Sequence, residues 1–283
     1  MNTAAHVYKI GWKRALIETR ITLTTVSDLL GNLMPLTIMI VVLWFMRSGS
    51  FEDAPVSLGA MSMPSLIGMN IAFGGMMTLV GLLVMDRTNG TLLRAKSMPG
   101  GMTGYLVGHL GSTALFLVFN TVVLLVVGMI VFDGLTFASP ERWLMFVLVL
   151  VMGLISMLSI GAVLGTLVNQ PQNMALVMMP FMGIIAVSGI FYPIAVLPGW
   201  LQGVGQVFPV YWLGLGMRHA LLPEATAAVE IGGSWRTVEM FAVLALWAIV
   251  SLALAPRLLR RMARRESGSS VAERRQAIRK SWG

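Results

Sequence analysis

The chain has 283 residues, of which 57% are hydrophobic and 11% charged; its mean hydropathy is +0.81 and its formal net charge +8. Soluble domains carry about 25% charged residues, so this composition indicates an integral membrane protein. Cysteine is absent, which excludes a disulfide framework and a thiolate metal site, and most basic residues lie beside apolar runs, which argues against a nucleic-acid partner.

Residues 1–27 mix apolar residues with lysines and arginines and include Tyr8 and Trp12. This pattern is typical of an amphipathic interfacial helix that lies on the membrane surface, with a flexible basic segment as the alternative. The segment lacks the apolar centre of a cleavable signal peptide, so we expect the first membrane span to direct targeting.

Residues 28–256 are predicted to form an all-α transmembrane domain of six helices. The expected spans are 29–46, 65–85, 105–132, 143–168, 174–192 and 237–255. Between the last two, residues 193–220 are apolar but interrupted by prolines and glycines, which favours short re-entrant helices. The basic tail, 257–283, is expected to continue the last helix into solvent.

Residues 86–104 form a charged loop between two apolar runs of membrane length, so this segment is expected to lie in water. Within it we expect a short helix over 91–97, capped by Thr88 or Asn89 and ended at Pro99. An ordinary loop that orients the spans by its charge is one interpretation. A helix gripped by a cytosolic partner is the other.

The distribution of positive charge predicts the orientation of the spans. Sixteen of the 20 lysines and arginines lie in the N-terminal segment, the 86–104 loop and the tail, and four lie on the other side. The positive-inside rule therefore predicts that both termini and the loop are cytoplasmic.

Residues suited to catalysis are sparse. The three histidines, His6, His109 and His219, lie in separate regions, and His109 is expected to contact lipid headgroups at a helix end. No GxxxxGK[ST] motif occurs, so the chain has no P-loop for ATP. The middle of each span lacks Asp, Glu, Lys and Arg, which argues against a proton or sodium relay.

The charged loop resembles the cytosolic loop of type-2 ABC exporter permeases, in particular the daunorubicin-resistance-like drug permeases. The matching residues are Asp86, Arg87, Gly90, Thr91, Leu92, Leu93, Arg94, Lys96 and Pro99. Aspartate at position 86 replaces the more common glutamate and keeps the charge. The resemblance implies that this loop couples the permease to its ATPase, with Arg87, Arg94 and Lys96 in ion pairs and Gly90 and Pro99 shaping the turns.

A second match follows the fifth span and resembles the outer re-entrant segment of the same family. Its residues are Gly189, Phe191, Pro193, Leu197, Pro198, Trp200 and Pro209. The two motifs occur in the family's order, and the resemblance covers nearly the whole chain.

The resemblance implies a non-enzymatic permease in the cell membrane, paired with a cytosolic ABC ATPase that binds ATP and Mg²⁺, and with a second permease copy or a related permease. Its cargo is expected to be a hydrophobic drug-like molecule or lipid. Expected residues of the path are Met69, Asn70, Phe73, Met77, Phe181 and Phe191. Export of a polysaccharide or glycolipid, a self-contained secondary transporter or intramembrane enzyme, and a structural or sensor protein are the alternatives.

Overall fold

The computed structural model describes residues 3–45, 57–98, 100–132, 135, 139–190, 192 and 194–265, and their regular secondary structure is entirely helical. Five of the described helices are long and apolar enough to cross a membrane: Val26–Phe45, Gly59–Asn89, Gly101–Val131, Pro140–Leu167 and Thr237–Arg264. A shorter apolar helix, Pro171–Val187, occupies the place of the fifth predicted span. The all-α, polytopic membrane fold is therefore confirmed.

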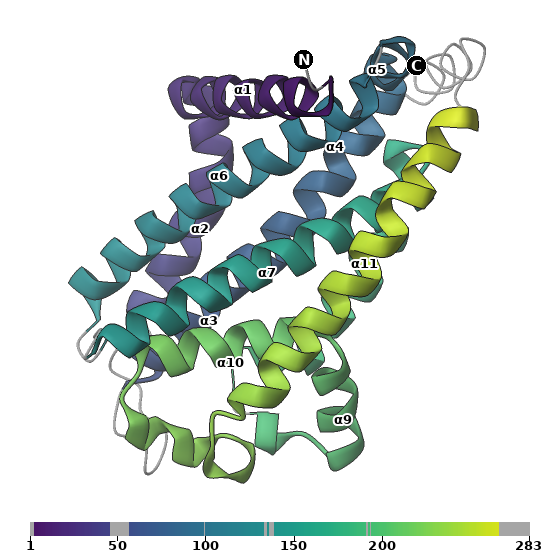
Figure 1. Cartoon of the computed structure of the whole chain (residues 1–283). Coiled ribbons are helices and arrows are strands. Elements are labelled where there is room, and N and C mark those ends of the chain that lie inside the picture. Colours follow the sequence, from purple (N-terminus) through teal and green to yellow (C-terminus); the bar gives the residue numbers. More distant parts are fainter. Residues whose placement is uncertain are drawn as a thin grey trace.

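Helix α1 (Thr3–Thr24) lies crosswise over one end of the long helices (Figure 1). It packs on α6 (Gly101–Val131), where glycines allow close approach: a Cβ on Gly11 would lie 2.8 Å from the Val107 Cβ, and one on Gly111 would lie 2.8 Å from the Ala15 Cβ. Along its other side α1 exposes apolar and basic side chains. The helix expected in residues 1–27 is therefore present, and its amphipathic, membrane-surface role stays a prediction. The first apolar helix, α2 (Val26–Phe45), follows directly.

The second span is one continuous helix made of α3 (Leu58–Met69), a π-helical turn η2 (Asn70–Gly74) and α4 (Gly75–Asn89). It begins earlier than predicted because the Ser57 side chain accepts a hydrogen bond from the Ala60 N–H at 3.2 Å, which caps the helix. Helix α3 packs on α10, whereas α4 packs on α7. The helix ends at Gly90, whose φ of +76° is in the left-handed region.

Glycines bring α4 close to α7 (Pro140–Leu167). A Cβ on Gly161 would lie 2.7 Å from the Met76 carbonyl oxygen, and one on Gly165 would lie 3.3 Å from the Val80 Cα. Small residues at such contacts let transmembrane helices pack backbone to backbone. Helix α11 (Thr237–Arg265) lies along the other side of α7 and continues past Pro256 into the basic segment.

The segment between α7 and α11 is a chain of short helices. In order these are η3 (Pro171–Met174), α8 (Ala175–Val187), η4 (Ile194–Val196), α9 (Gly199–Val207), α10 (Pro209–Leu221), η5 (Glu224–Val229) and η6 (Ile231–Gly233). Helices α9 and α10 lie at the end of the bundle opposite α1 and α5 (Thr91–Ser97) (Figure 1). We call these the α10 end and the α5 end. The predicted short helices are present, and their dipping into a membrane stays a prediction.

Two further predicted boundaries are wrong. Thr88 and Asn89 do not cap the short helix, because both belong to α4 and Gly90 separates α4 from α5. The fifth span stops at Val187 rather than 192, because the chain turns at Gly189, whose φ is +61° and against which Ile194 packs. Pro99, Phe191 and Pro193 lie outside the described residues.

Candidate functional site

Helix α5 presents two basic side chains from a firmly packed base. Leu92 and Ala95 are 1% and 4% exposed and face the bundle, where α5 contacts α4, α6 and α11. Arg94 and Lys96 are exposed, whereas Thr91 and Leu93 are half-buried. The chain reverses on both sides of the helix at glycines with positive φ, +76° at Gly90 and +66° at Gly100. The result is a short outward-facing helix whose free face is basic.

Arg87 points into the chain, although the sequence suggested an ion pair with a partner. Its side chain is buried and donates to the Val168 carbonyl oxygen at 2.6 Å, to the Asn169 Oδ1 at 2.8 Å and to the Thr166 carbonyl oxygen at 2.9 Å. These acceptors lie at the end of α7, whose last carbonyls have no partner within the helix. Arg87 therefore connects the last turn of α4, just before α5, to the end of α7 and the residue that follows it.

Asp86 joins α4 to α6. Its Oδ2 accepts a hydrogen bond from the Tyr105 hydroxyl at 2.8 Å and lies 2.9 Å from the His109 Nε2. Tyr105 and His109 are one turn apart on α6 and are both buried. Burial of the Tyr105 hydroxyl and the His109 Nε2 is tolerated because Asp86 pairs with both. Asp86, which the sequence placed in a water-exposed loop, is thus part of the packed helix bundle.

Helix α1 completes this polar cluster. The Arg14 Nε donates to the Glu18 Oε1 at 2.6 Å, and an Arg14 terminal nitrogen lies 3.2 Å from the His109 Nε2. Glu18 also accepts a hydrogen bond from the Ser112 hydroxyl at 3.0 Å. The expectation that His109 contacts headgroups is wrong, because the residue is 6% exposed between α1, α4 and α6. A signal was available: Arg14 with Glu18, and Tyr105 with His109, are paired at the four-residue spacing of a helix face.

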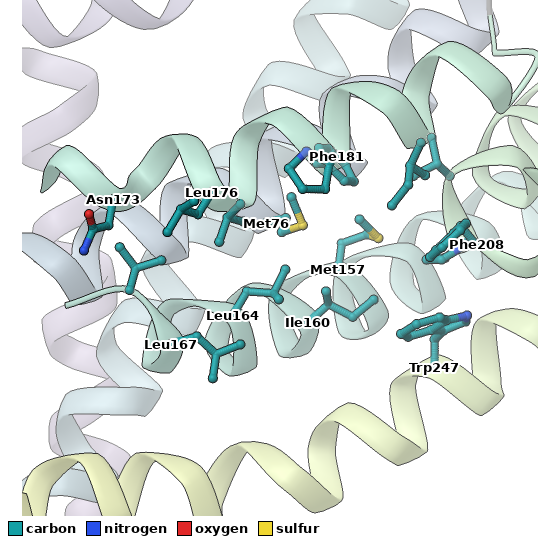
Figure 2. A pocket seen from close by; sticks show the side chains of 16 residues that line it. Met76, Met157, Ile160, Leu164, Leu167, Asn173, Leu176, Phe181, Phe208 and Trp247 are labelled. Atoms are coloured by element: carbon teal, nitrogen blue, oxygen red, sulfur yellow. The ribbon is translucent and has the colours of Figure 1, made fainter. Parts of the chain in front are cut away.

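An apolar cavity of about 480 Å³ opens between α7 and α8, beside Met76 of α4. We call it the α7–α8 groove. Figure 2 shows Leu176 and Phe181 on one wall facing Met157 and Leu164 on the other, with Trp247 near one end. The residues that line it are Met76, Met157, Ile160, Leu164, Leu167, Val168, Asn173, Leu176, Val177, Pro180, Phe181, Ile184, Phe208, Pro209, Val210 and Trp247. Asn173 and the Trp247 indole supply the polar side-chain groups, and the indole N–H already donates to the Val207 carbonyl oxygen at 2.9 Å. The groove suits an apolar ligand.

Of the described residues that the sequence assigned to a transport path, Phe181 alone lines this groove. Phe73 does not line the groove but stacks on Phe181, with ring centroids 6.1 Å apart. Met69, Asn70 and Met77 are half-buried elsewhere on the second span, and it is Met76, not Met77, that faces the groove. The π turn at 70–74 changes which face of the span points inward, and no local sequence pattern announces such a turn.

The motif after the fifth span has a structural role at the α10 end. A Cβ on Gly189 would lie 2.6 Å from the Ile194 Cβ, so this turn excludes any side chain. Pro198 precedes α9 and its carbonyl accepts the Leu201 N–H at 2.9 Å, while Leu197 is half-buried and Trp200 is 70% exposed. Pro209, buried, begins α10.

Helix α10 is anchored by a buried ion pair. The Arg218 Nε donates to the Glu230 Oε1 at 2.7 Å, and an Arg218 terminal nitrogen donates to the Ser65 hydroxyl of α3 at 2.7 Å. The Arg218 and Glu230 side chains are 7% and 4% exposed. Across residues 3–45, 57–98 and the later described segments, no group of three His, Asp or Glu side chains is placed to hold a metal ion.

Comparison with known proteins supplies a family for this arrangement. A family model described as ABC-2 family transporter protein matches residues 55–256, which span the second to the sixth apolar helices and include α5 and α10. No curated protein gives a significant match. The family model covers more than half of the chain, and its match supports a membrane permease of an ABC transporter, associated with an ABC ATPase. The daunorubicin-resistance-like subtype suggested by the sequence is not part of this match. The chain belongs to the ABC-2 transporter family.

Proposed function

We propose that the chain is the permease subunit of an ATP-driven exporter and that α5 is the element docked to its ATPase. The observation that carries this proposal is the arrangement of α5: Leu92 and Ala95 fix one face to the bundle, while Arg94 and Lys96 are free on the other. A cleft with acidic residues would grip this face. ATP and Mg²⁺ would bind to the partner, because this chain carries no P-loop motif.

The polar contacts around α5 supply a route for movement from the partner to the spans. Asp86 links α4 to α6 through Tyr105 and His109. Glu18 of α1 lies 3.5 Å from the other ring nitrogen of His109 and accepts a hydrogen bond from Ser112 of α6. Arg87 links the same turn of α4 to the end of α7 and to Asn169 just after it. A displacement of α5 would therefore move several spans together rather than one.

The proposed orientation puts the α5 end and both termini in the cytoplasm of a cell membrane, as the excess of basic residues at that end favours. The proposed transporter contains a second permease copy or a related chain. Helix α2 supports this, because only 6% of its most apolar 18-residue stretch is buried within the chain. In the other long helices the corresponding share is 28% to 56%. A second copy would cover α2.

The proposed cargo is a hydrophobic drug-like molecule or a lipid. Its support is the α7–α8 groove, about 480 Å³ in volume and lined almost wholly by apolar side chains that include Phe181 and Met76. Ligand sites of 300–1,000 Å³ with mainly apolar walls are typical of small-molecule binding. A polysaccharide would need hydroxyl partners, which this lining supplies only at Asn173.

The test is co-purification of the chain with the ATPase encoded beside it, followed by an assay of ATP hydrolysis. We expect Arg94→Glu to lower the affinity of the complex at least tenfold, because a charge reversal at a docked pair costs roughly 1.4 kcal/mol or more. The ATP turnover that the permease stimulates should fall with it. The matched control is Arg94→Lys, which keeps the charge.

Unchanged co-purification and unchanged ATP turnover for Arg94→Glu would overturn the docking role of α5. If the purified chain transported cargo alone, the exporter proposal would give way to a self-contained transporter. Vesicles loaded with a hydrophobic dye, or with a lipid-linked oligosaccharide, distinguish the two classes of cargo.

A further inference from the structure

A second groove lies under α1, on the side of the bundle formed by α6, α7 and α11. Its volume is about 580 Å³, and we call it the α1–α11 groove. It is lined by residues of α1, α6, α7 and α11, among them Tyr8, Trp12, Ile155, Ser159, Pro256 and Leu259. Ser159 does not point a free hydroxyl into it, because that hydroxyl donates to the Ile155 and Ser156 carbonyl oxygens at 2.6 and 2.9 Å. The groove is thus apolar and is separate from the α7–α8 groove.

The upper rim of this groove combines aromatic and basic residues. Tyr8 and Trp12 of α1 are 56% and 49% exposed, and each is followed directly in the chain by an exposed lysine, Lys9 and Lys13. Tyrosine and tryptophan prefer the layer between hydrocarbon and water, so these two rings mark where that layer lies.

The other rim is the last part of α11. Pro256 and Leu259 line the groove, and exposed arginines follow them at 257, 260, 261 and 264. Figure 1 shows this part of α11 at the same end of the bundle as α1. An apolar groove therefore opens beneath two rows of exposed cations, and the described rim residues on both helices include no exposed carboxylate beside them.

We infer that the α1–α11 groove is a binding site for one anionic phospholipid, with acyl chain in the groove and phosphate at Lys9, Lys13 and Arg260. Charge complementarity selects this occupant. Basic pockets between transmembrane helices bind anionic headgroups, and aromatic rings at the rim suit the glycerol layer. The chain's own segment 266–283 fits poorly, because it carries four basic and two acidic residues and would be repelled. In the proposed orientation the lipid comes from the cytoplasmic leaflet.

A lipid at this site would bridge helices that have few direct contacts. Helix α1 packs mainly on α6, and α11 packs mainly on α7. The acyl chain would fill the space between these two pairs, so α1 would be held against α11 through the lipid. Lipid composition would then influence how stably α1 holds its contacts with the polar cluster at His109.

The test is photo-labelling of the full chain in nanodiscs. Discs of phosphatidylcholine carry a trace of either phosphatidylglycerol or phosphatidylcholine with a photo-reactive acyl chain, and labelled peptides are mapped by mass spectrometry. We expect phosphatidylglycerol to label the α6, α7 and α11 peptides of the groove at least fivefold more than phosphatidylcholine. Removing one lysine, by Lys9→Gln or Lys13→Gln, is expected to lower labelling about fivefold at low salt.

Ile155→Trp tests the groove itself, because it fills the cavity from an exposed position on α7 (39% exposed). The matched control is Leu148→Trp, 42% exposed on the same helix outside the groove. Arg20→Gln, an exposed cation farther along α1, is the control for charge. We expect labelling to be lost in Ile155→Trp and kept in both controls.

Equal labelling by the two lipids, or undiminished labelling of the groove peptides in Ile155→Trp, would overturn the proposal. So would crosslinks that place a second copy of the chain or residues 266–283 in the groove. The readout needs no ATPase, so this inference and the exporter proposal fail separately.

Discussion

The two ends of the molecule hold their helices together in different ways. At the α10 end, glycines allow backbones to touch: a Cβ on Gly68 would lie 3.0 Å from the Leu213 carbonyl, and one on Gly216 would lie 2.8 Å from a Val149 methyl group. The Arg218–Glu230 ion pair is buried within this packing. At the α5 end glycines also bring α1 close to α6, but polar side chains of α1, α4, α6 and α7 connect the helices in addition, and Glu18, Asp86 and Ser112 among them are only half-buried.

This difference indicates which end is free to rearrange. Tightly packed apolar contacts resist movement because any gap loses many contacts at once. Half-buried groups such as Glu18 and Asp86 can exchange a protein hydrogen bond for one to water at small net cost. We expect the α5 end to change its contacts when a partner docks, while the α10 end moves as a unit.

The largest effect is expected from Arg218→Met at the α10 end. The change leaves Glu230 buried without its cation, which is expected to cost about 3–5 kcal/mol in the free energy of unfolding. Denaturant unfolding in nanodiscs measures it. The double variant Arg218→Met/Glu230→Leu removes both charges and should recover much of the loss; no recovery would mean that the ion pair is not the cause.

An intermediate effect is expected from Arg87→Met in the last turn of α4, just before α5. Three acceptors, the Val168 and Thr166 carbonyl oxygens and the Asn169 Oδ1, lose their donor. The expected cost is about 1–3 kcal/mol, measured in the same way. Arg94→Met, on the exposed face of the next helix, should change stability by less than about 0.5 kcal/mol. Equal losses in both variants would contradict the inward role of Arg87.

A smaller effect than that of Arg87→Met is expected from Asp86→Asn in the polar cluster. Asparagine keeps an acceptor for the Tyr105 hydroxyl but loses the charge near His109, so we expect a loss of about 1 kcal/mol. A double-mutant cycle with Tyr105→Phe measures the coupling. A loss as large as that of Arg218→Met would mean that the two ends are held equally firmly, and the proposed contrast would be wrong.

Much of the fold could be predicted because its signals are local. Apolar run length indicated the membrane helices, and prolines and glycines indicated the short helices at the α10 end. The cap of α5 could not be predicted from Thr88 and Asn89, since the left-handed turn at Gly90 decides where α4 ends. The early end of α8 depends on Ile194 packing against Gly189, a contact formed only in the folded chain.

The candidate site was predictable only in part, for a related reason. The exposed basic face of α5 follows from seven consecutive residues, so Arg94 and Lys96 were identified. The polar cluster joins residues about 95 positions apart, such as Arg14 and His109, and depends on how α1 crosses α6. Each charge was visible in the sequence, but its partner was not.

The π turn at Asn70–Gly74 has a consequence for comparing this chain with its relatives. Such a turn accommodates one residue more than an ordinary α-helical turn. Here it lets α3 face α10 while α4 faces α7; a regular helix of the same length would rotate the second set of contacts by about 100°. A relative with a regular span should therefore have one residue fewer at this point, and an alignment without a gap there would pair groove-facing Met76 with a residue on the wrong side of the helix.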